Sequence, residues 1–243
     1  MNSVGSSLLR ALACIGAWLA VPGVAQAGTE LIAGWEGSES RGYAFVSPVF
    51  NFRSDGEWSW VARGSVSHLH YDFTEAGDSI RVRSPGQAVG VGLRYAGPRL
   101  SATFGPGYEI RQTTRRSSSG ETKETERGAT VQAELFYQAT PRTNLSFLAA
   151  YGDANEYFWT RAGLKRQLTN LDYSGNTALH LGIELTSQGN DDGDANQIGG
   201  VFEVAFPKSR ASLQFRVGYS RISNPDSSEQ SDPYFGLGFY RGF

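Results

Sequence analysis

Cysteine is almost absent from this sequence. Among its 243 residues the single cysteine is Cys14, which lies inside an apolar run near the N-terminus. A small secreted domain often depends on disulfides for its stability. Neither a disulfide nor a thiol-based active site is available to the rest of this chain, so its fold must be stabilised in another way.

Long hydrophobic runs are equally scarce. The longest, Ala11–Val21, is too short for a transmembrane helix, which takes ~20 residues. It follows the polar segment Met1–Arg10, which carries one positive charge, and precedes the small-x-small sequence Ala25-Gln26-Ala27. These features predict a cleaved signal peptide over residues 1–27 and one domain over residues 28–243. A buried core helix is the alternative interpretation of the apolar run.

A strong charge bias is also missing. The net charge is −2 and the pI is about 6.0, which argues against a nucleic-acid partner because such partners leave a basic footprint. The chain nevertheless contains 30 glycines and 12% aromatic residues at a mean hydropathy of −0.34. A β-barrel in the bacterial outer membrane reconciles these values, because only every second residue of a barrel strand faces the surrounding lipids.

Apolar and polar residues alternate along most of the domain. In Leu179–Leu185 (LHLGIEL) and Leu213–Tyr219 (LQFRVGY) every second side chain is apolar, which places one set on each face of a sheet. We therefore predict an all-β, antiparallel transmembrane barrel of about 12 strands, with ten or fourteen as alternatives. The predicted strands are Thr29–Gly37, Gly42–Phe52, Glu57–Tyr71, Gln87–Ala96, Arg99–Thr113, Gly128–Ala139, Thr143–Tyr151, Glu156–Gln167, Thr177–Gln188, Asn196–Phe206, Ala211–Ile222 and Pro233–Phe243.

The connections alternate in length, as expected when both chain ends lie in the periplasm. A soluble β-sandwich, the rival fold, does not explain this alternation. We expect no helix after residue 27, and Leu168–Asn176 is long for a periplasmic turn. The short periplasmic turns are predicted at Arg53–Gly56, Gly97-Pro98, Thr140–Arg142 and Pro207–Arg210, and the outer loops at Asp72–Gly86, Thr114–Arg127, Gly189–Ala195 and Ser223–Asp232.

Aromatic residues mark the strand ends. Trp58 and Trp60 open one strand where an aromatic girdle is expected at the periplasmic interface. The C-terminus resembles the signature of outer-membrane barrels that the insertion machinery reads. Arg241 departs from that signature, since an aromatic or aliphatic residue is usual there. The residues that match it are Phe235, Leu237, Phe239 and Phe243.

If the apolar set faces lipid, the other set lines the interior and is heavily charged. Lone buried charges are costly, so these groups must pair with one another or meet water. Two interpretations stay open: a plug of mutually satisfied ion pairs, or a wet passage with fixed charges. Aromatic rings of the same phase could stack on a sugar or anchor the wall. The interior candidates are Arg63, Arg94, Glu109, Arg111, Glu134, Tyr157, Trp159, Arg161, Lys165, Glu184, Glu203 and Arg216.

Histidine is too rare for an evident enzyme site. A serine–histidine relay needs both groups within hydrogen-bond reach, but no Gly-x-Ser-x-Gly elbow or His-x-Ser pair accompanies His68, His70 and His180. The oxygen-rich turn Asn190–Asp194 lacks the glutamate that closes an EF-hand loop. We therefore expect no catalytic residue, no metal and no cofactor.

Four segments resemble the cellulose-biosynthesis BcsS family. They are Phe104–Glu109 (FGPGYE), Gly128–Phe136 (GATVQAELF), Ala149–Gly152 (AAYG) and Tyr157–Gly163 (YFWTRAG). The resemblance implies a non-catalytic outer-membrane accessory to exopolysaccharide biosynthesis or export, with cellulose as the polymer and the polysaccharide chain or its secretion machinery as partners. A small general porin or a structural barrel is the alternative, followed by a lipid-modifying barrel enzyme.

Overall fold

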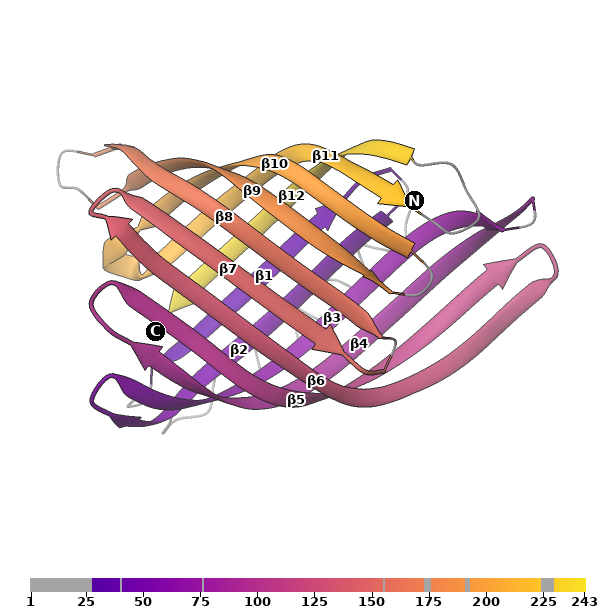
Figure 1. Cartoon of the computed structure of the whole chain (residues 1–243), viewed down its shortest axis with the longest axis horizontal. Coiled ribbons are helices and arrows are strands. Elements are labelled where there is room, and N and C mark those ends of the chain that lie inside the picture. Colours follow the sequence, from indigo (N-terminus) through magenta and orange to yellow (C-terminus); the bar gives the residue numbers. More distant parts are fainter. Residues whose placement is uncertain are drawn as a thin grey trace.

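The chain forms a closed antiparallel β-barrel, seen here in a computed structural model (Figure 1). The structure describes residues 28–39, 41–75, 77–154, 156–172, 176–190, 193–223 and 230–243, so the predicted signal peptide lies outside the described residues. The strands are β1 (Thr29–Gly37), β2 (Arg41–Asp55), β3 (Trp58–Glu75), β4 (Asp78–Ala96), β5 (Leu100–Ser117), β6 (Gly120–Thr140), β7 (Thr143–Gly152), β8 (Tyr157–Asn170), β9 (Ala178–Asn190), β10 (Gly193–Phe206), β11 (Ala211–Ser223) and β12 (Gln230–Gly242).

Every strand pairs with its neighbours in sequence, and β1 pairs with β12 to close the sheet. The prediction of a 12-stranded antiparallel barrel is therefore confirmed. A closed sheet leaves no edge, so each backbone N–H and C=O within the membrane can be satisfied by an adjacent strand. No helix in the described part of the chain is long and apolar enough to cross a membrane.

Polarity is distributed inside out, as a membrane barrel requires. The alternating apolar side chains point outward and are exposed, for example Ile183 at 61% and Val217 at 55%. Trp58 and Trp60 also face outward near the end that carries the C-terminus, where Trp58 packs against Tyr95 with ring centroids 5.2 Å apart. The outward surface therefore provides an apolar band with an aromatic rim at that end.

The predicted turns between β2 and β3, β4 and β5, β6 and β7, and β10 and β11 are short and lie at the end where β12 finishes (Figure 1). Leu168–Asn170 belong to β8, so part of Leu168–Asn176, the segment predicted as a long turn, is strand. One detail differs from the sequence-based expectation of no helix. Pro207–Ser209 forms a single 3-10 turn, which Arg210 ends in the left-handed region at φ 47°. Proline fixes the first backbone angle of such a turn, so the helical geometry is local to this connection.

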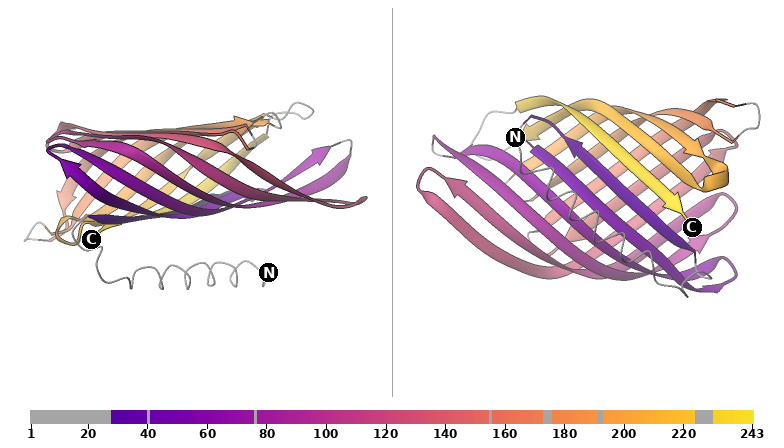
Figure 2. Two further views of the ribbon diagram at one scale, coloured as in Figure 1. Left: turned by 90° about the horizontal axis from the view of Figure 1, so that it is seen from below. Right: turned by 180° about the vertical axis from the view of Figure 1, so that it is seen from behind.

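The predicted outer loops Asp72–Gly86 and Thr114–Arg127 are wrong. These residues continue β3, β4, β5 and β6 as long hairpins that project beyond the other strands (Figures 1 and 2). The predicted loop Gly189–Ala195 is likewise mostly strand, while residues 224–229 of the last predicted loop lie outside the described residues. Strand pairing thus extends well past the ~9–11 residues needed to cross the membrane.

Candidate functional site

The interior of the barrel is the candidate site, because it gathers charged side chains from most strands. All 12 interior candidates point inward in the structure. The side chains of the ion-paired members are between 8% and 23% exposed. Period-two alternation explains this placement, since each candidate has the inward phase and is next to at least one outward apolar residue of its strand.

One ion-pair network spans the barrel. Glu36 of β1 pairs with Arg161 of β8, although these strands are not neighbours in the sheet. Arg161 also contacts Glu184 of β9, with Nε 3.2 Å from a carboxylate oxygen. The Nε of Arg216 on β11 lies 3.1 Å from the same oxygen of Glu184. The network therefore ties opposite walls together through alternating charges.

The other charged candidates form separate ion pairs, one of them with Glu30. Three of these pairs also join different strands, and Arg94 makes further contacts with the side chains of Asn51 and Thr103. Together with the network they comprise six cationic and six anionic side chains, so no described interior carboxylate of this set lacks a cation. Such pairing offsets the cost of removing each charge from water. The pairs are Arg63–Glu134, Arg94–Glu30, Arg111–Glu109 and Lys165–Glu203.

Two of these partners were missed by the sequence analysis. Glu30 and Glu36 both lie on β1, where they alternate with outward-facing Leu31, Ala33 and Trp35. That alternation is the signal that would have identified them. Both acids are needed to balance the cations, because Arg94 and Arg161 pair with them from other parts of the barrel.

A cavity of about 230 Å³ lies beside the network. Aromatic side chains contribute to its wall from both sides of the barrel: Tyr43 and Phe45 stack on β2, with ring centroids 5.7 Å apart, and Tyr157 and Trp159 face them from β8. The guanidinium carbon of Arg161 lies 4.6 Å from the centroid of Trp159. The volume is below the ~300–1,000 Å³ of typical small-molecule pockets, so the cavity as it stands suits water or one small ligand.

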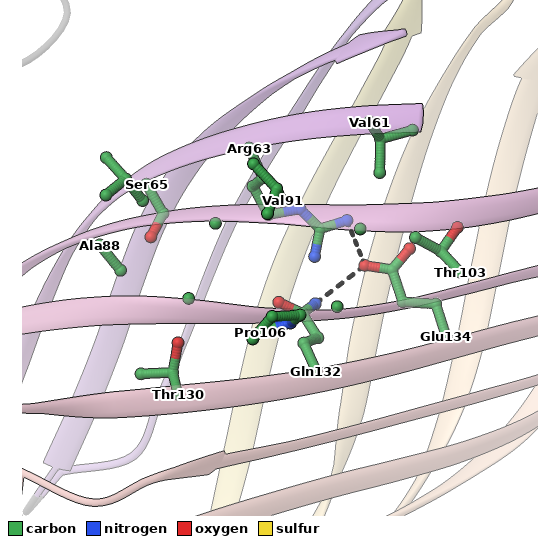
Figure 3. Close-up of a pocket in the computed structure, with 15 residues that line it drawn as sticks. Val61, Arg63, Ser65, Ala88, Val91, Thr103, Pro106, Thr130, Gln132 and Glu134 are labelled. Atoms are coloured by element: carbon green, nitrogen blue, oxygen red, sulfur yellow. Dashed lines mark hydrogen bonds and ion pairs between the residues drawn. The ribbon is translucent and has the colours of Figure 1, made fainter. Parts of the chain in front are cut away.

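A second, smaller cavity of about 70 Å³ lies between β3 and β6 (Figure 3). It is bounded by the Arg63–Glu134 pair, and the amide nitrogen of Gln132 donates to Glu134 at 2.8 Å. Glycines on β4 and β5 leave this space open. A Cβ at Gly105 would lie only 2.6 Å from the Cα of Gly92, so the two strands approach too closely for a side chain there.

Comparison with known proteins identifies the family. The family model for cellulose biosynthesis protein BcsS matches residues 24–243, which include the whole barrel. The chain belongs to the BcsS family. No curated protein sequence matches this BcsS-family chain.

Solved structures similar to this BcsS-family barrel are outer-membrane barrels. The β domain of the Bordetella autotransporter BrkA is 15% identical at a TM-score of 0.53, covering 89% of this chain and 98% of its own. The transport unit of AIDA-I from Escherichia coli is 10% identical at 0.53, covering 93% and 94%. LpxR from Salmonella typhimurium is 8% identical at 0.51, covering 87% and 99%. At these identities the likeness extends to the fold alone.

The histidines of this BcsS-family barrel are not arranged as a catalytic relay. His68 and His70 point outward from β3 with ring centroids 6.2 Å apart, while His180 faces inward near the start of β9. Among the described residues no hydrogen bond joins a histidine to a serine, and no group of three His, Cys, Asp or Glu could hold a metal. Asp191 and Asp192 of the oxygen-rich turn lie outside the described residues.

Proposed function

We propose that this protein is a non-catalytic outer-membrane accessory to cellulose biosynthesis that acts at the export step. The observation that carries the proposal is the family match, because it covers residues 24–243 and therefore the barrel as a unit. The partners implied are outer-membrane lipids, the barrel insertion machinery that would read Phe235–Phe243, and the polysaccharide chain or its secretion machinery.

The interior supports a barrel that is closed at rest. Glu36, Arg161, Glu184 and Arg216 bridge the walls, so a polymer could pass only if some of these pairs separated. Ion pairs in a partly wet interior exchange their partners for polar ligands more readily than apolar packing does, because hydroxyl groups can replace the lost hydrogen bonds. The aromatic walls beside the network supply flat apolar surface against which a sugar ring could stack.

A purely structural barrel is the second candidate, favoured by the pairing of the six cationic and six anionic interior side chains described above. Conductance in a planar bilayer distinguishes the two interpretations. Replacing both Arg94 and Arg161 with glutamine removes one cation from each of two pairing groups and should raise the conductance. A variant that inserts normally and conducts no more than wild type would favour the structural barrel over a passage that can open.

The primary test is a clean deletion strain grown under conditions that induce cellulose synthesis. We expect β-glucan to fall at the cell surface and rise in the periplasm, and the intact gene to restore both. Complementation with Arg161→Gln should restore less surface glucan than Arg142→Gln, a matched charge change in an exposed turn. An unchanged amount and distribution of β-glucan in the deletion strain would refute the export role.

A lipid-modifying activity is addressed with the same strain. The likeness to LpxR concerns the fold, and the histidine positions do not supply a relay. We therefore expect the lipid A and phospholipid profiles of the deletion strain to match those of its parent. A species that accumulates in the deletion strain and disappears on complementation would contradict the non-catalytic assignment.

A further inference from the structure

The long hairpins form a four-stranded extension beyond the apolar band. We call it the flap and define it as the described parts of residues 68–87 and 112–127, from β3, β4, β5 and β6. The last apolar side chains that face outward below it are Val66, Val89 and Ile110. Figure 2 shows the two hairpins continuing past the other strands at that end of the barrel.

The polarity of the sheet reverses in the flap. On the inner face, Tyr71 and Phe73 stack with ring centroids 6.0 Å apart, and Val82 is fully buried. The outer face carries polar and charged residues at the positions that are apolar lower in the barrel. A strand surrounded by hydrocarbon would keep its apolar side chains outward. We therefore expect the flap to stand above the hydrocarbon, with the base of its outer face at the level of the head groups of the outer leaflet.

Basic side chains dominate this outer face, and three of them are neutralised. Arg81 lies 3.3 Å from Asp72. Arg116 and Lys123 both contact Glu121, with nitrogen–oxygen distances of 2.5 Å and 3.0 Å. Hydrogen bonds from Lys123 and Arg116 hold the pKa of Glu121 below its ordinary value, so this carboxylate is ionised and engages both cations.

Arg83 and Arg127 differ from these paired residues. Both are exposed on the outer face, and neither makes an ion pair with any side chain that the structure describes. Arg83 lies opposite His70 and Thr114 on the adjacent strands, and Arg127 lies opposite Ile110 at the edge of the apolar band. The acids next to Arg127 in sequence do not reach it.

Those acids are Glu124 and Glu126, which have the opposite strand phase. Glu126 accepts a hydrogen bond from the hydroxyl of Thr113 at 3.2 Å, on the inner face of the flap. Alternation in β6 thus turns Lys123 and Arg127 outward and the two glutamates inward. The outer face therefore keeps two unneutralised cations: Arg127 at the edge of the apolar band, and Arg83 farther along the hairpin, opposite Thr114.

We propose that Arg83 and Arg127 bind phosphate groups of phosphorylated lipids in the outer leaflet. Arginine forms charge-assisted, often bidentate hydrogen bonds with phosphate oxygens, and the apolar side chains below would contact the acyl chains of the same lipids. The binding site depends on the outer-membrane location of the barrel and is independent of its role in cellulose production.

The test uses the full barrel in detergent micelles, with hexa-acylated diphosphoryl lipid A as the probe and native mass spectrometry as the readout. One arginine near an anionic lipid surface strengthens binding about fivefold, so R83Q/R127Q should bind about 25-fold more weakly than wild type. R142Q/R166Q, which removes two exposed arginines near the opposite end of the barrel, is the matched control and should bind as wild type does. A heat-sensitive shift in gel mobility verifies that each variant is folded.

Two further arms separate the lipid from free phosphate. In the first arm, lipid A without its phosphates should bind wild type no more tightly than intact lipid A binds R83Q/R127Q. In the second arm, inorganic phosphate at the concentration of the lipid should not displace intact lipid A from wild type. Equal weakening in both double variants would overturn the proposal by showing general charge attraction. Displacement by inorganic phosphate at that concentration would overturn the lipid assignment, as would unchanged binding by R83Q/R127Q.

Discussion

The network across the barrel predicts unequal effects of removing its members. Arg161→Gln leaves Glu36 without its cation, whereas Glu184 keeps Arg216. Both side chains of the Arg161–Glu36 pair are less than 15% exposed, so loss of the arginine should lower the free energy of unfolding by about 3–5 kcal/mol. Glu36→Gln should cost about 1–3 kcal/mol, because Arg161 retains Glu184 at 3.2 Å.

The double variant tests whether these energies come from the pair itself. Two residues in one ion-pair network are coupled, so the double substitution should destabilise by at least ~0.5 kcal/mol less than the sum of the single ones. Urea unfolding of the barrel in lipid vesicles provides the measurement, with Arg142→Gln in an exposed turn as the control. Strict additivity, or an Arg161→Gln variant as stable as the control, would refute the proposed coupling across the lumen.

Three further predictions concern the wall of the barrel. Ile183→Arg places a cation on the lipid face at a position that is 61% exposed, and should lower the free energy of unfolding by about 2–4 kcal/mol in a urea titration. Gly105→Ala should destabilise the barrel, because the new Cβ would lie 2.6 Å from the Cα of Gly92. Gly64→Ala is the control and should fold normally, because its Cβ would meet no atom closer than 3.9 Å. Equal melting curves for the two variants would contradict this prediction. Phe243→Ala should reduce the heat-modifiable, membrane-inserted fraction of the protein several-fold without changing its synthesis. Normal insertion of this variant would show that Phe243 is not part of the insertion signal.

The fold was predictable from sequence where lipid imposes alternation. Segments such as Leu213–Tyr219 have one apolar face because that face meets hydrocarbon, and strand count and direction follow from those segments. The hairpin of β5 and β6 escaped prediction because Glu121–Arg127 has no apolar face. The two strands still pair there through backbone hydrogen bonds and side-chain contacts such as that of Arg116 with Glu121. A hydropathy pattern does not indicate such contacts.

The inward orientation of the candidate residues could also be predicted from the sequence, but their ion-pair partners could not. Strand phase identifies Arg161 as an interior residue, yet its pairing with Glu36 depends on which strands face each other across the closed barrel. That relation follows from the strand order and the stagger at closure, neither of which is encoded in a local pattern. The distinction between paired and unpaired arginines in the flap likewise required the register of four strands.

The pairing of β1 with β12 has a consequence for the order of assembly. Each of the other contacts joins consecutive strands and can form as a hairpin, but this one requires the first and last strands to meet. Until then the backbone groups along both edges lack partners, which hydrocarbon tolerates poorly. We therefore expect closure to be the last step of folding, and a chain that lacks β12 to keep two open edges in the membrane.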